Sequence, residues 1–145
     1  MLCALCDENV EFLLVGAYAL AVHGYPRATG DLDIWVRCSD ENASRVWLAL
    51  RRFRAPTLNL RQEDLNTPDL VFQIGNAPRR IDILTSITGV AFDDASPYRT
   101  STIVDGRTVP VLGREQLRQN KKAAGRPKDL ADVAWLENSQ GIGGQ

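Results

Sequence analysis

The stretch that decides the fold reads Ala28-Thr29-Gly30-Asp31-Leu32-Asp33-Ile34-Trp35-Val36. Its second half is β-branched and aromatic, which predicts a strand. Alternate side chains of a strand share a face, so Asp31 and Asp33 project together while Leu32 and Ile34 project into a core. Two carboxylates about 7 Å apart repel each other unless a cation lies between them. We expect Mg²⁺, which takes carboxylate oxygens and keeps waters for a phosphate-bearing substrate.

A third carboxylate lies in a later stretch with strand character, Arg80-Ile81-Asp82-Ile83-Leu84. If this strand pairs with the one that carries Asp31, three carboxylates converge. Such a set can bind two divalent ions about 3.5–4 Å apart, one for the attacking oxygen and one for a nucleotide triphosphate. Asp82 is then the candidate ligand for the ion nearer the acceptor hydroxyl, and a candidate to accept its proton.

The bulk properties predict one ordinary globular domain. The chain has 145 residues, 44% of them hydrophobic and 24% charged, with a net charge of -1. This composition excludes disordered and fibrous classes and does not by itself indicate a partner. We expect a single domain over residues 1–145, with its core at about 10–138 and a flexible tail at 139–145.

The compartment is predicted from the cysteines and the apolar run 12–22. The three cysteines are an odd number in a chain that does not need disulfides, and no second Cys/His pair completes a zinc site. We expect buried thiols in a reducing cytoplasm. The apolar run is too short to span a bilayer and follows acidic residues rather than basic ones, so we expect no membrane association.

Apolar periodicity and turn residues predict the elements along the chain. We expect core positions for Tyr18, Trp35, Trp47 and Phe72, and a helix-end position for His23. One helical turn is predicted within 54–68, and 87–94 is ambiguous. The predicted strands are 12–15, 31–36, 70–74, 80–84, 101–104 and 108–112; the predicted helices are 17–22, 40–52, 115–124 and 127–138.

Basic residues dominate the segment 113–128, with Glu115 as its one acid. Such a cluster can hold phosphate or can form a solvated helix face. Asp129 and Asp132 are expected to face neighbouring cations or the helix dipole. The six basic residues are Arg114, Arg118, Lys121, Lys122, Arg126 and Lys128.

The motifs together resemble those of the DNA polymerase beta-like nucleotidyltransferase superfamily. The resemblance rests on Gly16 before a short helix, on Arg27-x-Thr29-x-Asp31-x-Asp33, and on Ile81-Asp82-Ile83. With Val15-Gly16-Ala17-Tyr18-Ala19 and the C-terminal Lys121, Arg126, Lys128-Asp129 and Asp132, the chain is similar to minimal bacterial nucleotidyltransferases related to abortive-infection toxins. The similarity spans about residues 12–136.

The resemblance implies an α/β (α+β) nucleotidyltransferase fold, with a mixed twisted sheet flanked by helices and two helices at the C-terminus. It also implies an NTP donor, ATP among the possibilities, two Mg²⁺ ions, and transfer of a nucleoside monophosphate to a hydroxyl. Asp31 and Asp33 match the metal-binding pair and Asp82 the third, catalytic carboxylate.

The nucleotide-binding residues are carried over in the same way. Gly16 matches the first position of the phosphate turn, but Ala17 replaces the family's serine or glycine, leaving backbone N–H groups as donors. Arg27 either steers phosphate or pairs with Asp31 or Asp33, and Thr29 either joins the site or caps the loop. Lys121 is the preferred phosphate or base-side cation, ahead of Arg126 and Lys128.

Three functional hypotheses follow. The first is a Mg²⁺-dependent nucleotidyltransferase whose acceptor is tRNA or a cognate partner protein, as in a toxin–antitoxin pair. The second is transfer to a small molecule of the aminoglycoside or lincosamide type, which requires an acidic cleft near Asp82 if the substrate is a polyamine. The third is a non-catalytic nucleotide-binding or antitoxin-like module, which Ala17 favours and the three mutually repelling carboxylates argue against.

Overall fold

A computed structural model describes residues 1–25, 31–76 and 79–143 of the chain, with side chains up to 138. These residues form a mixed α/β fold built on one six-stranded sheet, in the order β3-β4-β2-β1-β6-β5. The pairs β1–β6 and β2–β4 are parallel and the others antiparallel. The strands are β1 (Phe12–Val15), β2 (Leu32–Val36), β3 (Val71–Ile74), β4 (Ile81–Leu84), β5 (Thr100–Val104) and β6 (Arg107–Val111).

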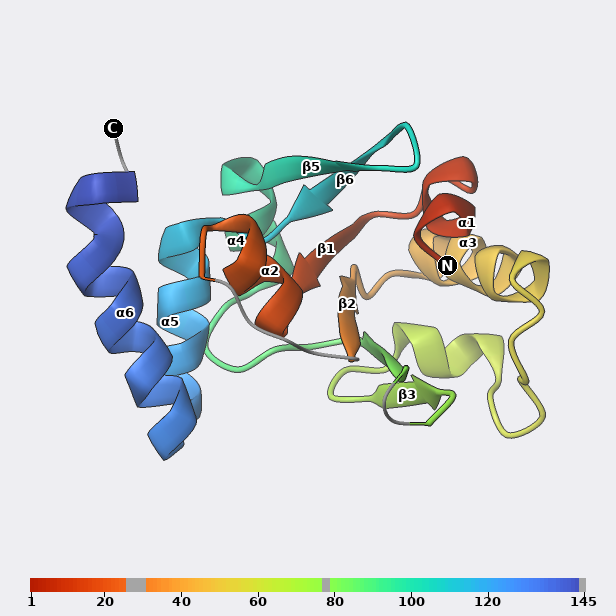
Figure 1. The fold of residues 1–145 in the computed structure, drawn as a ribbon. Helices are drawn as coiled ribbons and strands as arrows, with labels where there is room; N and C mark the ends of the chain where they lie inside the picture. The colour runs from red at the N-terminus through yellow and green to blue at the C-terminus, as the bar shows by residue number, and fades with distance from the viewer. Residues whose placement is uncertain (26–30, 77–78, 144–145) are drawn as a thin grey trace.

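The helices gather at two ends of the sheet (Figure 1). At one end α5 packs along α6 and also contacts α2; at the other, α1 packs against α3. The helices are α1 (Leu2–Asp7), α2 (Gly16–Val22), α3 (Asp40–Arg52), α4 (Phe92–Ala95), α5 (Arg114–Ala124) and α6 (Pro127–Gly143), with 3-10 turns η1 (Gln62–Asn66) and η2 (Ser96–Tyr98).

The predicted sheet and its flanking helices are confirmed. They were predictable because each has a clear hydrophobic period or a residue that favours the end of a helix or a turn. Ser39 caps α3 by accepting a hydrogen bond from the Asn42 backbone N–H. Gly125 ends α5 at φ 68°, a left-handed conformation that favours glycine. Asp105 and Gly106 form the turn between β5 and β6.

Several features differ from the sequence-based expectations. Helix α1 was not predicted, yet its Leu5 is fully buried in the core. Helix α6 continues past Asn138 to Gly143. The ambiguous stretch contributes the short helix α4, whose Phe92 packs edge-on against Trp35 with ring centroids 5.0 Å apart.

Two expectations about burial were wrong. Tyr18 is 40% exposed, because it lies on the side of α2 that faces away from the core. The three cysteines are free and only half-buried.

No helix among the described residues is long and apolar enough to cross a membrane.

The strand directions bring distant parts of the sequence to one edge of the sheet. Strand β1 ends where the antiparallel β2 begins, so Val15 lies opposite Asp33. Strand β4 runs parallel to β2 and begins at the same edge, where Asp33 lies opposite Asp82. The turn at Gly16 and the starts of β2 and β4 therefore meet.

Candidate active site

The three predicted carboxylates lie together at this edge. The β2–β4 register pairs Asp33 with Asp82, and the Leu32 backbone N–H donates to the Arg80 carbonyl at 2.9 Å, just before that pair. Asp82 is only 8% exposed, whereas Asp31 and Asp33 are half-buried. The prediction that the Asp82 strand would pair with the Asp31 strand is confirmed.

Gly16 lies directly against one of these carboxylates. Its φ is +68°, and a Cβ atom added there would lie 2.3 Å from Oδ2 of Asp33. Glycine is therefore required for its conformation and for the space that the carboxylate occupies. Ala17 follows as a half-buried residue in the first turn of α2. The phosphate turn proposed from the sequence thus adjoins the metal-binding pair proposed from the sequence.

The crowding of carboxylates changes the ionisation of Asp33. Burial, followed by the charges of Asp82 and Asp31, raises the pKa of Asp33 to about 6 from its ordinary 3.8, and Arg80 partly opposes the shift. A protonated Asp33 also donates a hydrogen bond to Asp82. Without a cation, the site therefore relieves its repulsion by retaining a proton up to about pH 6.

Arg80 is a member of the site that the sequence analysis missed. Its Nη2 lies 3.2 Å from Oδ2 of Asp31, and its Nε lies 3.1 Å from Oδ1 of Asp82. The signal was present in the sequence, because residues 80 and 82 share one face of a strand.

The donor set of the three carboxylates suits a hard divalent cation such as Mg²⁺. Asp82 Oδ1 is buried and lies 3.1 Å from Arg80 Nε, but it accepts no hydrogen bond of proper geometry in the described structure. Within residues 1–25, 31–76 and 79–138, however, no group of three or more acidic, His or Cys side chains stands in metal-binding geometry. Arg80 occupies the space between Asp31 and Asp82, so these two carboxylates are turned to the guanidinium.

Lys121 lies in a buried ion cluster between α5 and α6. Its Nζ is 3.5 Å from Asp129 Oδ1 and 3.3 Å from Asp132 Oδ2, and both aspartates are 0% exposed. Burial alone would raise the pKa of Asp129, but the hydrogen bond from Arg126 and the charge of Lys121 hold that pKa below its ordinary value. The expectation that Lys121 binds phosphate does not match this placement, since its ammonium already serves two carboxylates.

Other basic residues of 113–128 are also engaged within the protein. Arg126 pairs with Asp129 at 2.6 Å, as expected for a residue three positions before it, although its side chain is 62% exposed. Arg118 pairs with Glu115 and Glu137. Lys122 and Lys128 lie exposed on α5 and α6. The segment is therefore a set of helix-packing charges with a smaller exposed basic surface.

An aromatic stack anchors the chain just before the segment that leads to Asp31. The rings of Tyr25 and Trp135 stack with centroids 4.6 Å apart, and the Arg114 guanidinium lies 5.2 Å from the Trp135 ring centroid. Nε2 of His23 donates to the Leu112 carbonyl at 2.8 Å, which fits its predicted helix-end position. The predicted Arg27 and Thr29 lie outside the described residues.

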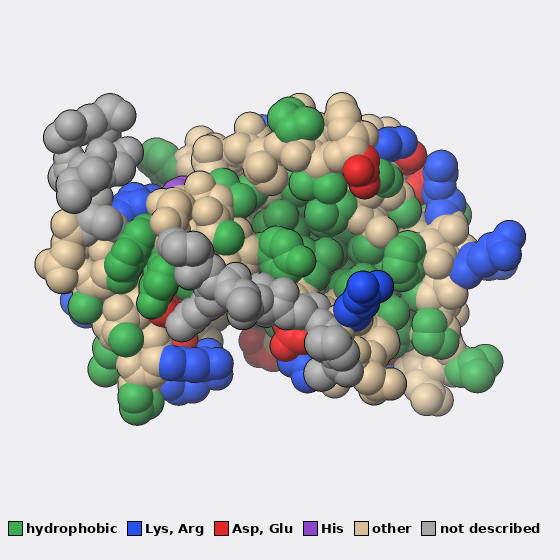
Figure 2. Space-filling view, viewed as in Figure 1, with side chains coloured by type: hydrophobic (Ala, Val, Ile, Leu, Met, Phe, Trp, Pro, Cys, Tyr) green, Lys and Arg blue, Asp and Glu red, His purple; other side chains and the backbone are tan. Residues whose placement is uncertain are grey.

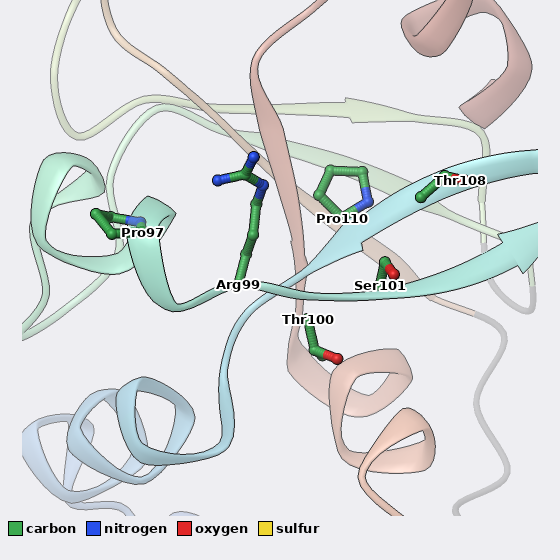
Figure 3. Close-up of a pocket in the computed structure, with 6 residues that line it drawn as sticks. All are labelled: Pro97, Arg99, Thr100, Ser101, Thr108 and Pro110. Atoms are coloured by element: carbon green, nitrogen blue, oxygen red, sulfur yellow. The ribbon is translucent and has the colours of Figure 1, made fainter.

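Several depressions of the described surface lie apart from the three carboxylates. One, of about 670 Å³, lies on the β5–β6 hairpin and the segment before it (Figure 3). It is lined by Pro97, Arg99, Thr100, Ser101, Thr108 and Pro110, so it offers no carboxylate to a cation.

Another depression, of about 490 Å³, lies where apolar side chains gather in the middle of the face shown in Figure 2. Leu32 lines it from the sheet face opposite Asp33. The other lining residues are Leu2, Leu14, Tyr18, Ala21, Val22, Thr102 and Val104.

Solved structures with the same arrangement of elements identify the fold. TM1012 from Thermotoga maritima, predicted to be a nucleotidyltransferase, aligns over 93% of this chain and 87% of its own, with TM-score 0.57 and 18% identity. The lincosamide antibiotic adenylyltransferase LnuA, solved with lincomycin bound, aligns over 90% of this chain and 88% of its own, with TM-score 0.53 and 12% identity. The chain has the nucleotidyltransferase fold.

These likenesses concern the nucleotidyltransferase fold and not the reaction. No protein-family model matches the chain, and no curated protein matches it in sequence. The fold does place the carboxylates of β2 and β4 beside the turn at Gly16. The chemistry of this chain must therefore be argued from those residues.

We predict that Gly16→Ala lowers the free energy of unfolding by about 2–4 kcal/mol. The new Cβ would clash with the Asp33 carboxylate, and alanine would have to adopt a left-handed φ. Gly24→Ala is the matched control, since Gly24 has φ +99° and open space around its Cβ position. Its cost should be about 1 kcal/mol. Urea unfolding measures both, and equal losses would show that Gly16 does not press on Asp33.

We predict a pH-dependent gain in stability for Asp33→Asn in EDTA. A raised pKa means that the folded state binds the Asp33 proton more tightly than the unfolded state does, so wild-type stability is lost as pH rises from about 4 through 6. Because Asp33 is half-exposed, we expect the variant to gain about 1–2 kcal/mol over wild type between pH 4 and 7.5.

Both Asp33→Asn and its control, Asp7→Asn, are measured by urea unfolding at a series of pH values. The hydrogen bond from Arg107 lowers the pKa of Asp7, so this substitution should become more destabilising as pH rises. A stability difference for Asp33→Asn that does not change with pH would contradict the crowding of the three carboxylates.

We predict that Lys121→Met lowers the free energy of unfolding by about 3–5 kcal/mol, because it leaves Asp129 and Asp132 buried beside each other without their shared cation. Lys122→Met, at an exposed neighbouring position, should stay within about 0.5 kcal/mol of wild type. Urea unfolding followed by circular dichroism compares them. A small loss for Lys121→Met would favour the original phosphate-binding expectation.

Proposed function

We propose that the protein is a Mg²⁺-dependent nucleotidyltransferase that moves a nucleoside monophosphate from an NTP to a hydroxyl acceptor. One observation carries the proposal: Asp33 and Asp82 lie opposite each other on parallel strands, with Asp31 on the same face and the turn at Gly16 against Asp33. Buried like charges are costly, so a fold that gathers them has a use for a cation.

Asp31, Asp33 and Asp82 are the residues that would hold Mg²⁺, two ions in the proposed arrangement. Bound there, Mg²⁺ would supply Lewis-acid polarisation of phosphate and hydroxyl oxygens. The backbone N–H groups at Gly16 and Ala17 are the proposed donors to the NTP phosphates. Asp82 is the proposed proton acceptor for the attacking hydroxyl, because its Oδ1 is buried and receives no hydrogen bond.

For the acceptor we propose a macromolecule, either tRNA or a hydroxyl side chain of a cognate partner protein such as an antitoxin. The support is the basic surface that remains on the C-terminal helices. Lys122 and Lys128 are exposed, and Arg126 is largely exposed despite its ion pair. This charge suits a phosphate backbone or an acidic partner.

The decisive experiment is radiolabel transfer from each α-labelled NTP into host-cell lysate. We predict that wild type labels RNA or protein, and that Asp31→Ala combined with Asp33→Ala lowers transfer at least about 100-fold, because the cation loses its ligands. Glu63→Ala combined with Asp94→Ala removes two exposed acids and should leave transfer unchanged. Transfer that survives the first double substitution would place the reaction elsewhere.

A second candidate is transfer to a small molecule of the lincosamide type. The support is that LnuA, solved with lincomycin bound, shares the fold. The apolar depression beside α2 and β2 lies on the sheet face opposite Asp33, so it is not the acceptor pocket of this candidate. In the same assay this candidate predicts label in the small-molecule fraction when lincomycin is added.

The non-catalytic alternative is separated by calorimetry. Isothermal titration with ATP, CTP, GTP and UTP, with and without Mg²⁺, should reveal Mg²⁺-dependent binding of at least one nucleotide. No such binding would exclude the transferase. Binding without any transfer would favour the nucleotide-binding or antitoxin-like module.

A further inference from the structure

Arg80 holds the position between the two outer carboxylates of the site. Its guanidinium reaches Asp31 through Nη2 at 3.2 Å and Asp82 through Nε at 3.1 Å. Its side chain is 34% exposed, although its Nε is buried. The Arg80 carbonyl accepts a hydrogen bond from the Leu32 N–H, which ties the backbone at residue 80 to β2. A change of partner therefore requires movement of the side chain alone.

The pairing between Arg80 and Asp82 is imperfect. The Arg80 Nε and Asp82 Oδ1 atoms are both buried and 3.1 Å apart, yet neither has a hydrogen bond of proper geometry. A buried ion pair is strongly favourable only when its geometry also satisfies the donor and acceptor. This contact neutralises charge without forming the fork that Arg makes with a well-placed carboxylate. The Arg80 guanidinium can thus leave Asp82 for another partner at little cost.

A divalent cation and the guanidinium would compete for the same oxygens. Both are positive, so they cannot share the space between Asp31 and Asp82. A guanidinium displaced from carboxylates is well suited to phosphate, because its parallel N–H donors match both groups. The nearest phosphate in the proposed reaction is that of the donor nucleotide, which the turn at Gly16 would hold beside Asp33.

We propose that Arg80 is a substrate-binding residue that changes partner. It neutralises Asp31 and Asp82 while the site lacks its cation, and it turns to the phosphates of the donor nucleotide when the cation takes those carboxylates. This inference rests on the proposed function and deepens it, by adding a cationic donor-binding residue from the chain itself. It also gives the site a guanidinium in place of the Lys121 ammonium, which is buried in the helix cluster.

The test uses two binding measurements whose changes should have opposite signs. Mn²⁺ binding to the protein alone is measured by the free-ion electron paramagnetic resonance signal, and nucleotide binding at saturating Mn²⁺ by calorimetry. Arg80→Gln should bind Mn²⁺ about 5- to 10-fold more tightly, because the competing guanidinium is gone. It should bind the nucleotide about 10-fold more weakly, because a charge-assisted phosphate contact is lost.

Two further variants sharpen the result. Arg79→Gln removes the same charge from the exposed neighbouring residue and should leave both affinities within about 2-fold of wild type. Arg80→Lys keeps the charge but not the fork, so it should keep Mn²⁺ affinity near wild type and weaken nucleotide binding. Thermal unfolding in EDTA verifies that each variant is folded.

The outcomes distinguish this inference from the proposed function. If wild type and Arg80→Gln bind Mn²⁺ equally, or if both affinities fall together, Arg80 is a structural residue and the inference is overturned while the transferase proposal stands. If wild type and Arg80→Gln bind neither Mn²⁺ nor any nucleotide, the proposed function is overturned and the inference with it. An increase in Mn²⁺ affinity together with a loss of nucleotide affinity supports both.

Discussion

Repulsion among three carboxylates at one edge of the sheet is the constraint to which the rest of this site responds. Three local features accommodate it: Gly16 provides space for the Asp33 carboxylate, Arg80 supplies a positive charge, and the raised pKa of Asp33 lets it keep its proton up to about pH 6. The Arg80 charge and the Asp33 proton are partial substitutes for a divalent cation. Among the residues that the structure describes, the site thus gathers three carboxylates around the Arg80 guanidinium.

The C-terminal helices solve a similar electrostatic problem in the opposite way. There, Asp129 and Asp132 are completely buried and Lys121 lies within 3.5 Å of both. With Arg126 adding a second cation at Asp129, the charges are matched within the protein. These fully buried, paired charges serve helix packing, whereas Asp31 and Asp33 at the sheet edge are only half-buried and can be reached by a ligand.

The sheet and the carboxylates were predictable because they depend on short-range patterns. The alternation around Asp31 and Asp33 marks a strand and its face, and the same alternation at Asp82 marks a second strand. Their adjacency was inferred only conditionally, since strand pairing is not a local property. The β2–β4 register of the structure confirms this adjacency, because it places Asp33 opposite Asp82.

What escaped prediction depends on which way a charged side chain points. Lys121 and Lys122 are neighbours of equal charge, yet one is buried between two aspartates and the other is exposed. A count of the cations in 113–128 cannot predict which lysine is buried, because the packing of α5 on α6 determines it. Arg80 was overlooked for a different reason: its role comes from Asp31 on another strand, although its shared face with Asp82 was visible in the sequence.

The stack of Tyr25, Trp135 and Arg114 has a consequence for the order in which parts of the protein fold during synthesis. Tyr25 precedes the segment that leads to Asp31, whereas Trp135 lies in α6, which follows every other described element. During synthesis the strands that carry the carboxylates emerge from the ribosome before the aromatic ring that anchors their approach. The chain can thus pair its strands early, while the ring contact of Tyr25 forms only once α6 is in place.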